Sequence, residues 1–140
     1  MKKILILSVM LGVLAPLLSA ARGAEKVVRA TVGGDGVQRV EVVGGSYFFA
    51  PNHLIVAAGV PVELTVRKEK GLVPHDIVLK APEAGIDFRV PLDAKPKVIR
   101  FTPKRAGVFP FYCDKRLLFF ESHRERGMAG VLEVTAPQSE

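Results

Sequence analysis

Hydrophobic residues alternate with polar or small residues in short runs along most of this chain. Val62, Leu64 and Val66 take every second position in one run, and Phe109 and Phe111 do the same in another. Successive side chains of a β-strand point to opposite faces, so a period of two predicts strands with one buried face. The pattern therefore favours β-structure.

Runs of this kind follow one another at close intervals, and glycine or proline separates them. Residues 33–36 read Gly-Gly-Asp-Gly and predict a hairpin-like turn between the first two runs. Many short strands bounded by turn residues indicate an all-β sandwich or barrel. The runs that predict strands are 27–32, 37–43, 46–50, 53–59, 61–66, 75–80, 97–103, 107–113 and 130–136.

Three segments lack the strand pattern. Residues 81–96 contain three prolines and are expected to be loosely structured. Residues 114–127 carry charges of both signs around the run LLFF, and we expect a loop there with room for one helical turn. Residues 138–140 are expected to form a short disordered tail.

The first residues predict a secretory signal peptide. Two lysines precede an apolar run over residues 4–21, and small residues follow it. We expect the signal peptide to span residues 1–21, with cleavage possible as late as Ala24. The alternative is a retained membrane anchor, but the apolar run has 18 residues, includes Pro16 and is only marginally long enough to span a bilayer.

Residues 22–140 are expected to form a single domain exported to the periplasm. Loss of the first two lysines lowers the formal net charge from +6 to +4, which does not indicate a nucleic-acid binder. The single cysteine cannot form an internal disulfide. Metal ligation would explain a lone thiol in an oxidising compartment.

The residues with metal-binding chemistry gather towards the end of the chain. Cys113 is the only cysteine, His75 and His123 are two of three histidines, and Met128 is the only methionine after the first ten residues. One thiolate, two imidazoles and one thioether are the ligand set of a mononuclear blue-copper site. The third histidine, His53, follows a turn and is expected at the surface, outside this site.

Strand periodicity predicts where these ligands lie. Cys113 ends the run that contains Phe109 and Phe111 and shares their inward parity. His123 and Met128 lie on the following loop, before the last strand begins. A strand, a cysteine, a loop and a second strand would therefore bring three ligands to one end of a sandwich, and His75 would come from a neighbouring strand.

Four motifs resemble the cupredoxins, the family of small blue-copper proteins that includes plastocyanin, azurin and pseudoazurin. The resemblance spans roughly residues 45–135 and implies a Greek-key β-sandwich of about eight strands that binds one copper ion, Cu(I) or Cu(II). It implies His75, Cys113, His123 and Met128 as the ligands. The motifs are FAPNHLIVAAGVPVELTV (49–66), PHD around His75, GVFPFYC (107–113), and H-x4-M followed by AGVLEV (129–134).

The chain departs from the family pattern at two places. Nine residues separate Cys113 from His123, more than in plastocyanin-like members and close to the length in copper nitrite reductases. The residue after the first histidine is often asparagine in the family and ties two ligand loops together. Here it is Asp76, which can accept the same hydrogen bonds but adds a charge.

The resemblance implies an electron carrier rather than an enzyme, because four protein ligands leave no open position for a substrate. Electrons would leave through an exposed edge of His123. The surrounding loop would dock a redox partner with an acidic surface, and the protein is expected to be a monomer that meets a membrane only if the signal segment is retained. The docking residues would be Lys115, Arg116, Arg124 and Arg126, with the apolar residues Leu117, Leu118, Phe119 and Phe120. In the alternative interpretation, the charges are merely solvated and the apolar run packs down as a lid.

Two other classes of function stay open at the level of sequence. A periplasmic copper carrier or cuproenzyme assembly factor would use the same sandwich, although such carriers tend to display several methionines or histidines, and only Met128 follows the predicted signal peptide. A metal-free interaction module would leave the cluster of cysteine, histidine and methionine unexplained.

Overall fold

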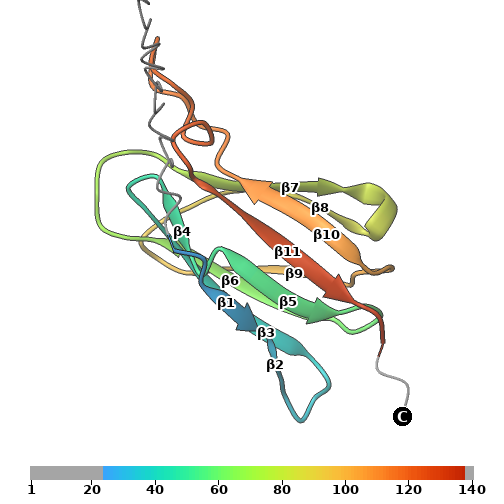
Figure 1. Ribbon diagram of the computed structural model, residues 1–140. Coiled ribbons are helices and arrows are strands. Elements are labelled where there is room, and N and C mark those ends of the chain that lie inside the picture. Colours follow the sequence, from blue (N-terminus) through green and yellow to red (C-terminus); the bar gives the residue numbers. More distant parts are fainter. Residues whose placement is uncertain (1–23, 138–140) are drawn as a thin grey trace, which may run out of the picture.

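The computed structural model describes residues 24–137, in which two β-sheets pack face to face (Figure 1). The elements are β1 (Val27–Arg29), β2 (Thr31–Val32), β3 (Gln38–Gly45), β4 (Phe48–Ala50), β5 (His53–Ala57), β6 (Val62–Lys68), β7 (Asp76–Ala81), η1 (Pro82–Ala84), β8 (Ile86–Pro91), β9 (Lys97–Phe101), β10 (Gly107–Tyr112) and β11 (Ala129–Thr135). One sheet has the order β1-β5-β11-β10-β7-β8, and the other has the order β2-β3-β6-β9 with β4 paired to β3. The predicted all-β sandwich is confirmed.

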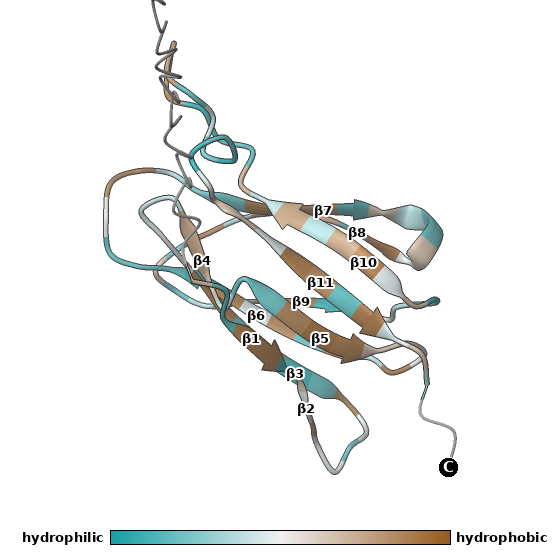
Figure 2. Cartoon of the chain, viewed as in Figure 1, coloured by the Kyte–Doolittle hydropathy of each residue, from teal (hydrophilic) through white to brown (hydrophobic). Residues whose placement is uncertain are grey.

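The core lies between the two sheets and is built by the alternation seen in the sequence. Val62, Leu64 and Val66 of β6 are at most 2% exposed, and Phe109 and Phe111 of β10 are buried opposite them in the other sheet. Figure 2 shows hydrophobic and hydrophilic bands alternating along β10 and β11. β6 and β10 therefore each turn one face towards the core, whereas β7 is buried on both faces.

The first predicted strand, residues 27–32, divides between the two sheets. β1 pairs in parallel with β5, whereas β2 pairs antiparallel with β3. The chain crosses at Ala30, which is buried and donates its N–H to the carbonyl of Ile55 at 2.9 Å. Alternation continues through the crossing, so the sequence pattern does not reveal the change of sheet. This division contributes to the larger number of strand segments than the family resemblance implies.

The expectation of a loose segment over residues 81–96 is wrong, because β8 occupies its centre. Ile86 is fully buried, and Phe88 and Val90 pack against the core, which is a strand pattern of period two. Pro91 ends β8, which is an edge strand of its sheet. Proline lacks a backbone N–H and is tolerated there, because no further strand needs a hydrogen bond from that side. The prolines of this segment therefore mark the ends of an edge strand rather than its absence.

Residues 114–127 form a loop between β10 and β11, as predicted. The two strands are antiparallel neighbours, so the loop leaves and returns at the same end of the sandwich, beyond which it projects (Figure 1). The predicted signal peptide, residues 1–21, and the tail, residues 138–140, lie outside the described residues. Within residues 24–137, we find no helix with the length and apolar character needed to cross a membrane.

Candidate metal centre

Cys113 enters the site because it continues the inward parity of β10. Phe109, Phe111 and Cys113 are 7%, 1% and 0% exposed, in agreement with the predicted common face. β10 ends at Tyr112, so Cys113 is the first residue of the loop while its side chain still follows the strand. The thiol therefore lies at the end of the core, at the junction of strand and loop.

His75 reaches the same place because β7 runs antiparallel to β10. Tyr112 is paired with Val78, and this register carries the start of β7 towards the residues that follow β10. Asp76, the first residue of β7, donates its N–H to Sγ of Cys113 at 3.4 Å. The residue before it, His75, is thereby held beside the thiol.

The long loop between Cys113 and His123 folds back on itself through backbone hydrogen bonds. The N–H of His123 donates to the carbonyl of Lys115 at 2.9 Å, and the N–H of Met128 donates to the carbonyl of His123 at 2.9 Å. Cys113 in turn donates its N–H to the carbonyl of Met128 at 3.1 Å. The length of this loop therefore does not prevent the second histidine from returning to the cysteine.

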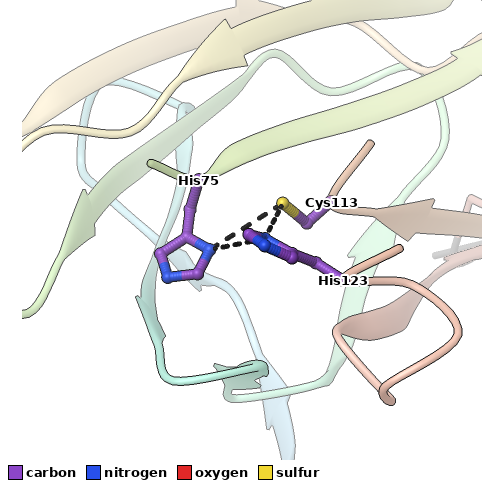
Figure 3. A group of neighbouring side chains, drawn as sticks. All are labelled: His75, Cys113 and His123. Carbon is purple, nitrogen blue, oxygen red and sulfur yellow. Dashed lines mark hydrogen bonds between the residues drawn. The ribbon is translucent and has the colours of Figure 1, made fainter. Parts of the chain in front are cut away.

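His75, Cys113 and His123 point their donor atoms towards one another (Figure 3). Sγ of Cys113 lies 3.4 Å from Nδ1 of His123 and 3.9 Å from Nδ1 of His75, and the two Nδ1 atoms are 3.1 Å apart. Three predicted ligands are thus gathered in one buried group that could hold a metal ion.

The three donor atoms fit a single metal ion. A point equidistant from atoms with these separations lies about 2.0 Å from each, close to the metal–nitrogen and metal–sulfur bond lengths of about 2.0–2.3 Å in proteins. Two imidazoles with one thiolate form a set that suits copper in both common oxidation states. The donor set therefore passes a test of both chemistry and spacing.

Burial sets the protonation of the metal-free group. It lowers the pKa of His75, and the charges of His123 and Lys68 lower it further. It also lowers the pKa of His123, with a smaller contribution from Arg126. Both imidazoles are therefore neutral near pH 7 and present lone pairs. Burial raises the pKa of the Cys113 thiol, although the Asp76 N–H opposes this, so a metal must displace the thiol proton when it binds.

Met128 is fully buried beside this group, and its backbone is bonded to both Cys113 and His123. Gly44 of β3 makes room for its side chain, because a Cβ at that glycine would lie 3.2 Å from the Met128 methyl carbon. The methionine therefore packs at the same end of the core as the other three predicted ligands. Its role as an axial ligand remains a prediction.

Asp76 ties the two ligand-bearing segments together, as the resemblance implies for this position. Its Oδ1 accepts the N–H of Asp114 at 2.7 Å, and its Oδ2 lies 3.3 Å from Nη1 of Arg89. Lys115 adds a second cation at 3.9 Å. The carboxylate is 1% exposed, so its charge is compensated by neighbours rather than by water.

The surroundings of His123 differ from expectation. Its side chain was expected to present an exposed edge, but it is only 2% exposed and Tyr47 lies against it. The apolar run does not form a lid over the site, since Leu117, Leu118, Phe119 and Phe120 are 52%, 74%, 99% and 61% exposed. The expectation about His123 is therefore wrong, and the lid interpretation is excluded.

His53 lies outside the group, as predicted. Its Nδ1 contacts Glu25 and its Nε2 contacts Glu133, both at 2.8 Å. These two carboxylates raise the pKa of the imidazole, and Glu25 has the larger effect. Both ring nitrogens are thus occupied in ion pairing.

Two residues of the site have no signal in the sequence analysis. Tyr47 turns its ring towards both imidazoles from the turn between β3 and β4, and only a tertiary contact places it there. Arg89 pairs with Asp76 and Asp114, and it lies in the segment for which no strand was predicted. Recognition of the alternation at 86–90 would have found the strand, although not the partners of Arg89.

No protein-family model matches the chain, and a search of curated proteins finds no match. Several solved structures have a fold similar to that of this chain. The metal-binding domain of the Cu(I)-exporting P-type ATPase CopA from Streptococcus pneumoniae D39, solved with Cu(I), is 24% identical with a TM-score of 0.59, over 81% of this chain and 99% of that one. Dithionite-reduced auracyanin from the photosynthetic bacterium Roseiflexus castenholzii is 19% identical with a TM-score of 0.55, over 69% and 96%. The periplasmic domain of cytochrome oxidase subunit II (CoxB) of Bradyrhizobium japonicum is 13% identical with a TM-score of 0.53, over 70% and 83%.

These similarities concern the fold, because the sequence identities are low. They agree with the motif resemblance in the sequence and with the two-sheet architecture of the described residues. The chain therefore has a cupredoxin-like fold, with a group of two histidines and one cysteine that could bind a metal at one end.

Proposed function

We propose that the protein is a mononuclear type 1 copper protein that carries single electrons between redox partners. The observation that supports this most directly is the buried group of His75, Cys113 and His123, whose donor atoms have the spacing of a single metal site. The three side chains are 6%, 0% and 2% exposed. A buried centre suits an electron carrier, because the electron can cross a short protein layer while the ion stays in place.

In this proposal, His75, Cys113 and His123 would hold the copper ion, and Met128 would contribute a weaker thioether contact. Bound copper would alternate between Cu(I) and Cu(II) and so take up and release one electron. The protein side chains hold the donor atoms in place through the Asp76 bonds and the folded loop. Little rearrangement is then needed when the charge of the centre changes.

Export to the periplasm belongs to the same proposal. It rests on the predicted signal peptide over residues 1–21 and on the lone buried thiol, which ligation would protect. The similar CoxB domain is periplasmic. We infer no enzymatic activity, since the four proposed ligands would surround the ion with protein.

The loop over residues 114–127 is the proposed docking surface for a redox partner with an acidic face. Arg116, Arg124 and Arg126 are exposed there, and Lys115 is partly exposed. The exposed run Leu117–Phe120 adds apolar contact area at the tip. A mixed basic and apolar surface beside the metal centre favours fast, salt-dependent encounters with an acidic partner.

A copper carrier is the second candidate. The similar CopA domain belongs to a Cu(I) exporter, and that observation favours metal transfer. Delivery of an ion requires that an acceptor reach the ligands, however, and the two imidazoles and the thiol are almost entirely buried. Burial therefore makes the electron carrier the better-supported function.

Optical titration of the purified protein with Cu(II), followed by ascorbate, tests the proposal. We expect an intense visible thiolate-to-copper band at one equivalent, bleached by ascorbate and lost in Cys113→Ser. His53→Gln is the matched control, because it removes a histidine outside the group and should leave the band unchanged. Tight binding without the band would favour the carrier, and absence of binding would contradict both functions.

A further inference from the structure

Tyr47 occupies an unusual position against the candidate metal ligands. It lies in the turn between β3 and β4 with a φ of 65°, in the left-handed region that a residue with a large side chain rarely adopts. Its ring meets the His123 ring edge-on at 5.0 Å between centroids and the His75 ring at 6.3 Å. The strained turn thus brings one aromatic ring over both imidazoles.

Arg126 lies over the face of the Tyr47 ring. Its guanidinium carbon is 3.7 Å from the Tyr47 centroid, which is a close cation–π contact. The backbone N–H of Arg126 donates to the carbonyl of Ser122 at 3.1 Å and so anchors the residue within the ligand loop. Tyr47 therefore contacts both the ligand imidazoles and the Arg126 guanidinium.

This stack joins two parts of the chain that lie far apart in sequence. Tyr47 comes from the β3–β4 turn of one sheet, whereas Arg126 comes from the loop that joins β10 to β11 in the other. Both ligand imidazoles are almost entirely buried, although His123 belongs to an otherwise exposed loop. Backbone strain that persists at such a place points to a functional constraint.

We propose that Tyr47 and Arg126 form a cover that closes the metal centre against water and small ligands and thereby retains the bound ion. This inference rests on the proposed copper site, but the closure is a property of the side chains present without metal. The ring excludes solvent from the imidazoles, and the guanidinium holds the ring in place. Tyr47 and Arg126 are therefore positioning residues.

The first experiment needs no metal. The rate of Cys113 alkylation by iodoacetamide in the copper-free protein reports access to the centre, because Cys113 is the only thiol and is fully buried. We expect Tyr47→Ala to raise this rate by about tenfold or more, as local protection of a buried group is lost. Arg126→Ala should raise it less, and Tyr47→Phe should match the unmodified protein.

Arg124→Ala is the matched control. Arg124 lies over the Tyr112 ring at 4.3 Å, so the same kind of contact is removed from the same loop without touching either ligand imidazole. Its alkylation rate should stay at the level of the unmodified protein. Equal acceleration in Arg124→Ala and Arg126→Ala would mean general loosening of the loop and would overturn the cover.

The second experiment uses the Cu(II)-loaded protein. Tyr47→Ala should bind azide, seen as a change in the visible spectrum, and should lose copper to EDTA faster than Tyr47→Phe does. Unchanged alkylation in both Tyr47→Ala and Arg126→Ala would overturn the proposal, and if Tyr47→Ala does not fold, Arg126→Ala decides. Failure to bind copper would contradict the proposed function but would leave the alkylation result intact, so the two failures are distinguishable.

Discussion

The carboxylate of Asp76 shows how one buried residue organises the candidate site. The carboxylate accepts a hydrogen bond from the backbone N–H of Asp114 and pairs with Arg89. The backbone N–H of the same residue donates to Sγ of Cys113. An asparagine could accept the same backbone bond but could not form the ion pair. The side chain thus has two separable roles, one as an acceptor and one as a charge.

Substitutions at Asp76 should separate these roles. We expect Asp76→Ala to lower the free energy of unfolding of the copper-free protein by about 1–3 kcal/mol, because the partly buried hydrogen bond from the Asp114 N–H loses its acceptor. Asp76→Asn keeps an oxygen at that place and should cost under about 1 kcal/mol, since Arg89 and Lys115 are partly exposed. Urea unfolding measures both, and equal losses would show that the charge, not the acceptor, holds the loops.

The loop between β10 and β11 is the element in which the chain departs most from a compact sandwich. At its tip, the N–H of Phe120 donates to the carbonyl of Leu117 at 3.0 Å and closes a turn. The four apolar side chains of this turn are exposed to solvent. Large exposed apolar residues at one tip are typical of interaction surfaces. The loop carries four basic residues against the acidic residues Asp114, Glu121 and Glu125, so its small positive excess can be tested.

Reversal of one charge in this loop should slow electron exchange with an anionic oxidant. We expect Arg116→Glu to lower the rate of oxidation of the reduced, copper-loaded protein by hexacyanoferrate(III), and to weaken the fall of that rate with added salt. Lys104→Glu is the matched control. Lys104 is also exposed, but it precedes the start of β10 and so lies at the opposite end of that strand from the loop. Equal effects of both variants, measured by stopped flow, would indicate net charge rather than a local docking surface.

At the scale of the whole molecule, His53 connects the beginning of the described chain to its last strand. Its imidazole bridges Glu25, just before β1, and Glu133 of β11. The two carboxylates raise the pKa of His53 above its ordinary value of 6.5. The protonated imidazole therefore stabilises the folded state across a sequence separation of 80 residues.

This bridge predicts a pH dependence of stability with a definite sign. A raised pKa in the folded state means that the stabilisation is fully present below pH 6.5 and is lost as the pH rises through the folded-state pKa. We expect the difference in stability between the unmodified protein and His53→Gln to shrink over that range, from at most about 1 kcal/mol because the groups are partly exposed. Thermal unfolding of copper-free protein at several pH values measures it, and a difference that grows with pH would contradict the bridge.

The fold class and the ligand group could both be predicted from the sequence. Period-two alternation is local, so it identified most strands and the shared inward face of Phe111 and Cys113. The candidate ligands are few, so residue type together with the motif resemblance singled out His75, Cys113 and His123, and the structure brings their donor atoms together. Residue type determines the available ligand chemistry, and local periodicity determines which side chains share a strand face, so both can be read from the sequence.

Only the tertiary structure decided which segments meet. The sequence pattern does not mark the crossing at Ala30 between the sheets, because alternation continues through it. The family resemblance implied an exposed edge of His123, whereas that side chain is buried and Tyr47, from the turn between two strands of the other sheet, packs against it. Contacts between distant segments depend on how the sheets pack, so a local pattern of polarity cannot predict them.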